Sequence, residues 1–148
     1  MTERKGGSDV ANGTETIAIR NSSENSQYKL YGYKWFSSAT DADITITLAR
    51  CFNKETNKLD KGLTMFLANV RNKDGTLNGI EIHKLKDKLG TRQLPTAELL
   101  LDGMTAYKMS EEGRGISKMA SMLNITRIHN SLASVSNMRR QFIYFQLF

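Results

Sequence analysis

The spacing of apolar residues changes near residue 110, so a single chain carries two kinds of secondary structure. Before this point short runs alternate between apolar and polar residues; in the segment ITITLAR, Ile44, Ile46 and Leu48 share one face of an extended strand. After it, apolar residues recur every three or four positions, which is helical spacing. The pattern predicts a β domain at residues 1–110, followed by one long helix of about thirty residues within 111–148.

Several other runs in the first part of the chain also have the pattern of strands. Tyr31, Tyr33 and Trp35 fall on one face of their run by the same alternation. Residues 63–70 are apolar on both faces, which predicts a central strand. Short strands joined by turn-forming residues favour a barrel or a sandwich over a parallel α/β sheet. The runs predicted as strands are 15–20, 28–36, 44–50, 63–70, 79–85 and 97–104.

The predicted helix has signals at both ends and an apolar stripe between them. Ser110, Glu111 and Glu112 come just before it, where hydrogen-bond acceptors and negative charge suit a helix start. Arg139 and Arg140 come later, where cations suit a helix end. An amphipathic helix must bury its stripe, either on the β domain or on partners outside this chain, and we favour the second. The stripe consists of Ile116, Met119, Leu123, Ile128, Leu132, Val135, Met138 and Phe142.

The composition is that of an ordinary folded domain. Of the 148 residues, 39% are apolar and 24% are charged, and no apolar run is long enough to cross a membrane. The net charge of +6 is compatible with nucleic acid, anionic lipid or an anionic small ligand, but the basic residues are mostly scattered. We interpret the two small basic clusters, Lys84, Lys86 and Lys88, and Arg139 and Arg140, as solvated surface.

Residues that often carry chemistry are sparse. His83 and His129 have no further metal-ligating residues at the required spacing, so the sequence supports no metal site. The single cysteine, Cys51, excludes an internal disulfide and fits a reducing compartment, and no nucleophile motif surrounds it.

Two segments are candidates for binding. Gly6 and Gly7 leave the backbone free to adopt positive φ, and Ser8 follows, so this turn could expose N–H groups to a phosphate or pyrophosphate. Taken alone, a plain surface turn is the favoured interpretation. Trp35 at a strand end could offer a flat face to an aromatic ligand, with Ser37 on the same side as a hydrogen-bonding group. The alternative is that Trp35 belongs to the core.

Taken together, the motifs resemble the acyl-CoA dehydrogenase superfamily. The matching segments occur in order along nearly the whole chain and look most like the subgroup of alkylation-response flavoproteins. They are MTERKGGSD (1–9), GYKWFSSATDAD (32–43), KLKDKLGTR (84–92), EEGRGI (111–116) and NITRIHNS (124–131).

The resemblance implies a mainly β fold, namely the middle-domain β-barrel at residues 1–110 followed by the first helix of the C-terminal helical domain at 111–148. It also implies an internal fragment of a parent enzyme that uses FAD to dehydrogenate an acyl-CoA at its α and β carbons, with hydride passing to flavin N5. The parent would be a homodimer or homotetramer, in a mitochondrion or a peroxisome. The alternative function is a DNA-associated, non-dehydrogenase flavoprotein.

The resemblance also assigns roles to individual positions. Met1 and Thr2 match the segment that meets the flavin ring, and Ser37 matches the hydroxyl that bonds flavin N5. Trp35, with Phe36 beside it, matches the aromatic packing on the isoalloxazine. Ser8 matches the serine near the FAD pyrophosphate and the thioester arm of acyl-CoA. Asn124 and Arg127 match helix positions that contact CoA, although relatives often have an acidic residue in place of Asn124.

No catalytic base is expected within this chain. Some members of the family place the catalytic glutamate beside the position matched by Arg127, but here that residue is Thr126, which cannot remove a proton. Most members place it in a later segment. The matched roles of Glu3, Glu111 and Glu112 are structural.

Overall fold

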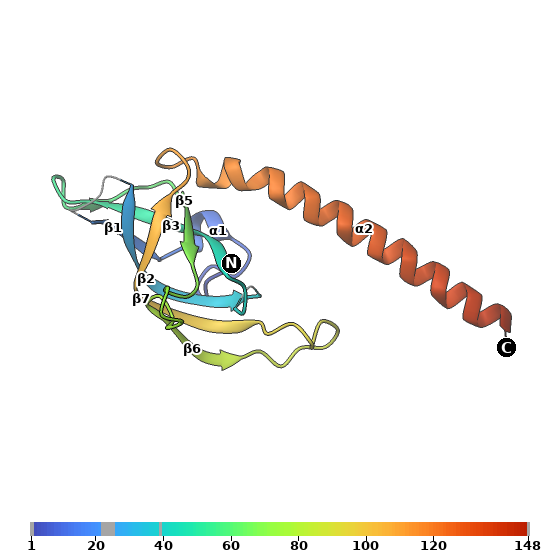
Figure 1. Cartoon of the computed structure of the whole chain (residues 1–148). Coiled ribbons are helices and arrows are strands. Elements are labelled where there is room, and N and C mark those ends of the chain that lie inside the picture. The colour runs from blue at the N-terminus through green and yellow to red at the C-terminus, as the bar shows by residue number, and fades with distance from the viewer. Residues whose placement is uncertain (1, 22–25, 39, 148) are drawn as a thin grey trace. The chain divides into compact units, whose positions relative to one another are not determined.

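The computed structural model describes residues 2–21, 26–38 and 40–147 (Figure 1). The chain divides into two compact units, Met1–Ile116 and Ser117–Phe148. The first unit is built from strands with a short helix near its start, and the second is helical. A mainly β domain followed by a C-terminal helix is therefore confirmed.

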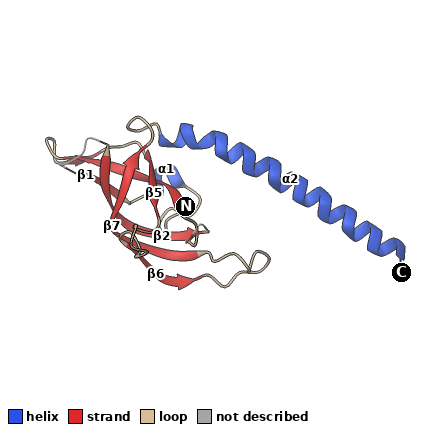
Figure 2. Ribbon diagram, in the orientation of Figure 1, coloured by secondary structure: helices blue, strands red, loops and turns tan. Residues whose placement is uncertain are grey.

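The strands of the first unit form one continuous sheet (Figure 2). Their order is β1-β2-β7-β5-β3-β4, and β6 pairs with β7. β1 also pairs with β3 in a parallel arrangement, so the two end strands of the series β1-β2-β7-β5-β3 are paired with each other. The other pairings are antiparallel. The bounds are α1 Val10–Gly13, β1 Ile17–Arg20, β2 Gln27–Ser37, β3 Ile44–Asn53, β4 Lys58–Leu59, β5 Thr64–Asn69, β6 Ile80–Leu85 and β7 Ala97–Lys108.

Every strand predicted from alternation is present, and β5 is central because it pairs with β3 on one side and β7 on the other. Local turn chemistry explains the ends of the strands. The Asn53 side chain accepts hydrogen bonds from the backbone N–H groups of Glu55 and Thr56, which turns the chain after β3. The Asp74 side chain bonds Thr76 in the same way, beside Gly75 at φ 84°.

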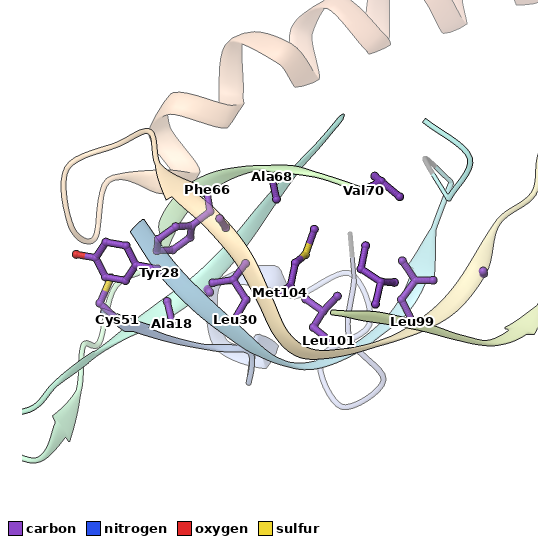
Figure 3. Close-up of a cluster of buried hydrophobic side chains, with 14 residues drawn as sticks. Ala18, Tyr28, Leu30, Cys51, Phe66, Ala68, Val70, Leu99, Leu101 and Met104 are labelled. Carbon is purple, nitrogen blue, oxygen red and sulfur yellow. The ribbon is translucent and has the colours of Figure 1, made fainter. Parts of the chain in front are cut away.

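The core lies on the inner face of the sheet. Figure 3 shows its labelled side chains as one continuous layer, from Tyr28 and Cys51 at one end to Leu99 and Val70 at the other. Tyr28 and Phe66 meet edge to face, with ring centroids 5.2 Å apart. Burying a large apolar side chain stabilises a domain by about 1.5–3 kcal/mol, so this layer is the main source of stability. Its members are Ala18, Tyr28, Leu30, Ala49, Cys51, Phe66, Ala68, Val70, Ile80, Ala97, Leu99, Leu101, Met104 and Ala106.

A β-bulge near the end of β2 changes which side chains point inward. Lys34 pairs with Leu99 and Ser37 pairs with Ala97, so two residues of β2, Trp35 and Phe36, lie against one intervening residue of β7. Lys34 and Ser37 are buried, whereas Trp35 and Phe36 are partly exposed. The expectation that Ser37 shares a side with Trp35 is therefore wrong, because simple alternation assumes a register without an extra residue.

Helix α2 spans Gly115–Leu147, which is 33 residues and confirms the predicted long helix. It continues past Arg139 and Arg140, so these cations do not mark its end. The expectation of a single apolar stripe is also wrong, because apolar residues outside the predicted set, such as Met122, Ile125 and Ile143, spread around the helix. Within the described residues, no helix combines the length and apolarity needed to cross a membrane.

Candidate functional site

The two segments singled out for binding meet in the structure. Thr2 and Phe36 form an antiparallel bridge, and the backbone N–H of Trp35 donates to the carbonyl oxygen of Thr2 over 2.8 Å. The segment at Thr2 therefore pairs through its backbone with the last residues of β2. This pairing brings together Thr2, Trp35, Phe36 and Ser37. Met1 lies outside the described residues.

A buried ion pair holds the same two segments together. Lys34 Nζ lies 2.7 Å from Glu3 Oε1, and the two side chains are 1% and 4% exposed. Lys34 also donates to the carbonyl oxygen of Leu48, and Glu3 accepts from the backbone N–H of Glu15 and from the Thr16 hydroxyl. A buried charge needs this many partners, so the pair fixes where the start of the chain lies.

The environment of the pair also changes its titration. Burial by itself raises the pKa of the Glu3 carboxyl, but the Lys34 ammonium and the hydrogen bonds from Lys34, Thr16 and Glu15 together hold that pKa below its ordinary value. Glu3 therefore stays ionised at neutral pH.

The glycine-bearing turn is closed by its own backbone. The N–H of Gly7 donates to the carbonyl of Glu3, and the N–H of Gly13 donates to the carbonyl of Asp9. A Cβ placed on Gly6 would lie 2.4 Å from the Cα of Gly13, so two backbones cross here without room for a side chain. Ser8 lies on the exposed side of this turn.

Trp35 lies beneath cationic side chains. Lys86 Nζ lies 3.1 Å from the centroid of the indole ring, and Arg4 Cζ lies 5.2 Å from it. The Lys86 ammonium also pairs with Glu98 at 2.6 Å, and Glu98 accepts a hydrogen bond from the hydroxyl of Tyr33. Trp35 is thus neither buried in the core nor an uncovered surface residue, because it is partly exposed and cationic side chains lie over its ring.

Interpreting Lys86 as solvated surface is wrong, because its side chain is only 11% exposed. The sequence contains a signal for this role, since Lys84, Lys86 and Lys88 alternate along an extended segment. The signal becomes specific only once β2, β7 and β6 are known to be neighbours.

Ser37 lines a cavity beside the core residues of the sheet instead of the outer face. The remaining lining is mostly apolar, and the cavity also receives Thr47 from β3. Among the described residues, the buried side-chain oxygens that lack a hydrogen-bond partner are Ser37 Oγ and Thr47 Oγ1. Sequence reasoning missed Thr47, whose strand shows only ordinary alternation. The lining residues are Ser37, Thr40, Thr45, Thr47, Val70, Leu77, Ile80, Ile82, Leu99, Leu101 and Met104.

Asn124 and Arg127 belong to the second unit, on the exposed surface of α2. The guanidinium of Arg127 donates to Asn124 Oδ1 over 3.3 Å, so the two side chains form one polar patch. In the described ranges, no three His, Cys, Asp or Glu side chains gather where they could hold a metal ion.

The family comparison agrees with the motifs assembled at this strand end. The model of the acyl-CoA dehydrogenase middle domain matches residues 1–104. The chain belongs to this family. Its first 104 residues hold both the Thr2–Phe36 bridge and the cationic contacts of Trp35.

Individual relatives extend the similarity beyond the β domain. Acyl-CoA dehydrogenase family member 11 of Caenorhabditis elegans is 54% identical over 142 residues, covering 95% of this chain and 23% of the relative. The protein AidB of Escherichia coli is 36% identical over 142 residues, covering 96% of this chain and 24% of AidB. The chain thus spans about a quarter of the length of the curated relatives it matches.

The same likeness holds in three dimensions. The crystal structure of Caenorhabditis elegans ACDH-11 in complex with C11-CoA is 52% identical, with a TM-score of 0.89. The match covers 95% of this chain and 24% of that structure.

Proposed function

We propose that this chain is the flavin-facing domain of an FAD-dependent acyl-CoA dehydrogenase. The observation that carries the proposal is the pairing of Thr2 with Phe36, because it joins the two matched flavin segments at one strand end. Membership of the family and the enzyme names of its relatives support the same reaction class. The strand pairings that return to β1 support the finer proposal that the sheet is the middle-domain barrel. We also propose the domain boundary at 110/111, which lies between the end of β7 at Lys108 and the start of α2 at Gly115.

The residues present fit a flavin. Trp35 and Phe36 are partly exposed aromatic rings beside each other, with centroids 6.3 Å apart, and can pack on a planar ring system. Ser37, which the resemblance matches to the hydroxyl at flavin N5, is buried on the other side of β2 from Trp35, and its Oγ has no hydrogen-bond partner among the described residues. Ser8, which the resemblance matches to the pyrophosphate, is exposed on its turn, and Thr2 lies beside Phe36 at the proposed ring site.

The bound flavin would supply the hydride acceptor, and this chain's residues would position it. Lys86 and Arg4 would place positive charge beside the ring that packs on the flavin. Asn124 and Arg127 would contact the CoA part of an acyl-CoA substrate. The catalytic base would come from outside these residues, since the matched position is Thr126. We also propose a homodimeric or homotetrameric parent. The comparisons do not favour the DNA-associated alternative.

The experiment is a titration of FAD into the purified chain, followed by tryptophan fluorescence. Trp35 is the single tryptophan, so the whole signal comes from the proposed site. We expect saturable quenching. Binding to a Trp35→Phe variant, followed by calorimetry, should be weaker by about three- to tenfold, as loss of an aromatic contact predicts.

A Tyr107→Phe variant is the matched control, because it changes an exposed aromatic residue that is not assigned to the site. It should bind FAD as the unaltered chain does. A chain that shows the circular dichroism of a folded β domain but no saturable quenching would contradict the proposed function.

A further inference from the structure

Two buried hydroxyls face one cavity in the β domain, and a flavin at Ser37 would not account for both. Ser37 is 2% exposed and Thr47 is 1% exposed. Their oxygens lack partners among the described residues, although both line the same cavity. A buried hydroxyl without a hydrogen bond is destabilising, so a pair of them at one cavity calls for a shared partner.

The cavity has the size of a small polar ligand. Its volume accessible to the centre of a water molecule is about 20 Å³, and a site needs roughly 10–15 Å³ by this measure to hold one water. The rest of the lining is mostly apolar, from side chains such as Val70, Leu99 and Met104. This volume has room for about one water molecule, and the Ser and Thr hydroxyls of the lining are the side-chain groups that can hydrogen-bond it.

We propose that the cavity binds one ordered water molecule that bridges Ser37 Oγ and Thr47 Oγ1. The hydroxyl of Thr40 already donates to the carbonyl oxygen of Ser37 over 2.7 Å, so the backbone of this residue is held from one side. The bridging water holds its side chain. Thr47 is therefore a positioning residue, which fixes the direction of the Ser37 hydroxyl without touching any ligand itself.

The part of this inference that concerns cofactor binding rests on the proposed function. A serine hydroxyl can rotate among three staggered positions, and a fixed partner selects among them. With the water in place, the Ser37 side chain is held in one rotamer, next in the chain to the Trp35 and Phe36 rings that would pack on a flavin.

The first test needs no cofactor. Replacing Thr47 by valine keeps the shape of the side chain and removes its hydroxyl. If the water is present, Thr47→Val leaves it short of a partner, and we expect the thermal midpoint to fall by about 4 °C. If the cavity is dry, the same variant removes an unpaired buried hydroxyl, and the midpoint should stay or rise. An unchanged or raised midpoint would overturn the proposal.

Thr45→Val is the matched control, since Thr45 lies on the same strand and lines the same cavity but is not among the unpartnered buried hydroxyls. It should change the midpoint less than Thr47→Val. A Ser37→Ala and Thr47→Val double-mutant cycle should show coupling of about fivefold in the unfolding equilibrium constant, because one water serves both groups. Additive effects would contradict a shared water. A crystal structure should show density within about 3.2 Å of both oxygens, absent in Thr47→Val.

The second test uses FAD. Thr47→Val should weaken FAD binding by about three- to tenfold, and should have no further effect in the Ser37→Ala background. An equal loss in both backgrounds would overturn the positioning role. If the unaltered chain binds no FAD, the proposed function fails, while the stability cycle still decides whether the water is bound.

Discussion

The backbone N–H of Trp35 donates to the carbonyl oxygen of Thr2, and this hydrogen bond joins positions 33 residues apart in the sequence. It attaches the start of the chain to a strand end that would otherwise be open. The ion pair between Glu3 and Lys34 lies directly beside it and makes the attachment specific. The geometry of the candidate site therefore depends on residues that belong to no regular strand.

Removing one member of the Glu3–Lys34 pair should strongly destabilise the fold. Glu3→Gln or Lys34→Met should each lower the free energy of unfolding by about 3–5 kcal/mol, because each leaves a buried charge without its partner. The double variant should cost less than the sum of the two. Urea denaturation of the four proteins measures this, with the exposed pair variant Lys5→Met as the control. Additive losses would show that the two charges do not interact.

Acid should weaken the same contact in a defined direction. Because the pKa of Glu3 in the folded chain lies below its ordinary value of 4.5, the carboxylate stabilises the fold above pH 4.5. This contribution should be lost as the pH falls from about 4.5 through the folded pKa. Denaturation at a series of pH values should show the gap between the unaltered chain and Glu3→Gln narrowing in acid. A gap that is constant with pH would contradict the shifted pKa.

Lys86 should control the fluorescence of Trp35. Its ammonium lies against the indole ring, so Lys86→Met should shift the emission maximum by removing a fixed charge while keeping a similar aliphatic stem. Lys84→Met is the matched control on the same extended segment, and it should leave the spectrum unchanged. Identical spectra for both variants would show that Lys86 does not rest on the ring in solution.

The glycine crossing at the N-terminal turn should not tolerate a methyl group. A Cβ on Gly13 would lie 2.1 Å from the Cα of Gly6, so Gly13→Ala should destabilise the β domain by about 1–3 kcal/mol or displace the turn. Ser8→Ala changes an exposed side chain of the same turn and should cost less than about 0.5 kcal/mol. Thermal denaturation compares the two. Equal stability of both variants would contradict a tight crossing.

Patterns that depend on neighbouring residues in the sequence predicted most of the fold. Alternation located the strands, and helical spacing located α2, because each reflects the local repeat of the backbone. The β-bulge at Trp35 and Phe36 could not be seen this way, since an extra residue leaves no mark in the apolar pattern. The inward direction of Ser37 was missed for this reason.

The charged contacts of the site also could not be predicted from local sequence patterns. Lys34 is buried only because Glu3 reaches it across 31 positions, and Lys86 meets Trp35 only because β6 and β2 both pair with β7. The resemblance pointed to the two segments that the structure pairs at Thr2 and Phe36, but not to which side chains turn toward Trp35, the interior or the solvent. Thr47 illustrates the limit, since nothing around it in the sequence distinguishes it from Thr45.

The strand series that returns to β1 has a kinetic consequence. Ile17 pairs with Arg50 and Gln27 pairs with Tyr107, so the sheet closes only when segments that are distant in the sequence have paired. Folding of this unit should therefore be slow for its size. The strand end at Trp35 takes shape only in that closed arrangement. A ligand that binds there would therefore bind only after the sheet has closed. It would slow unfolding of the whole β unit more than it speeds folding.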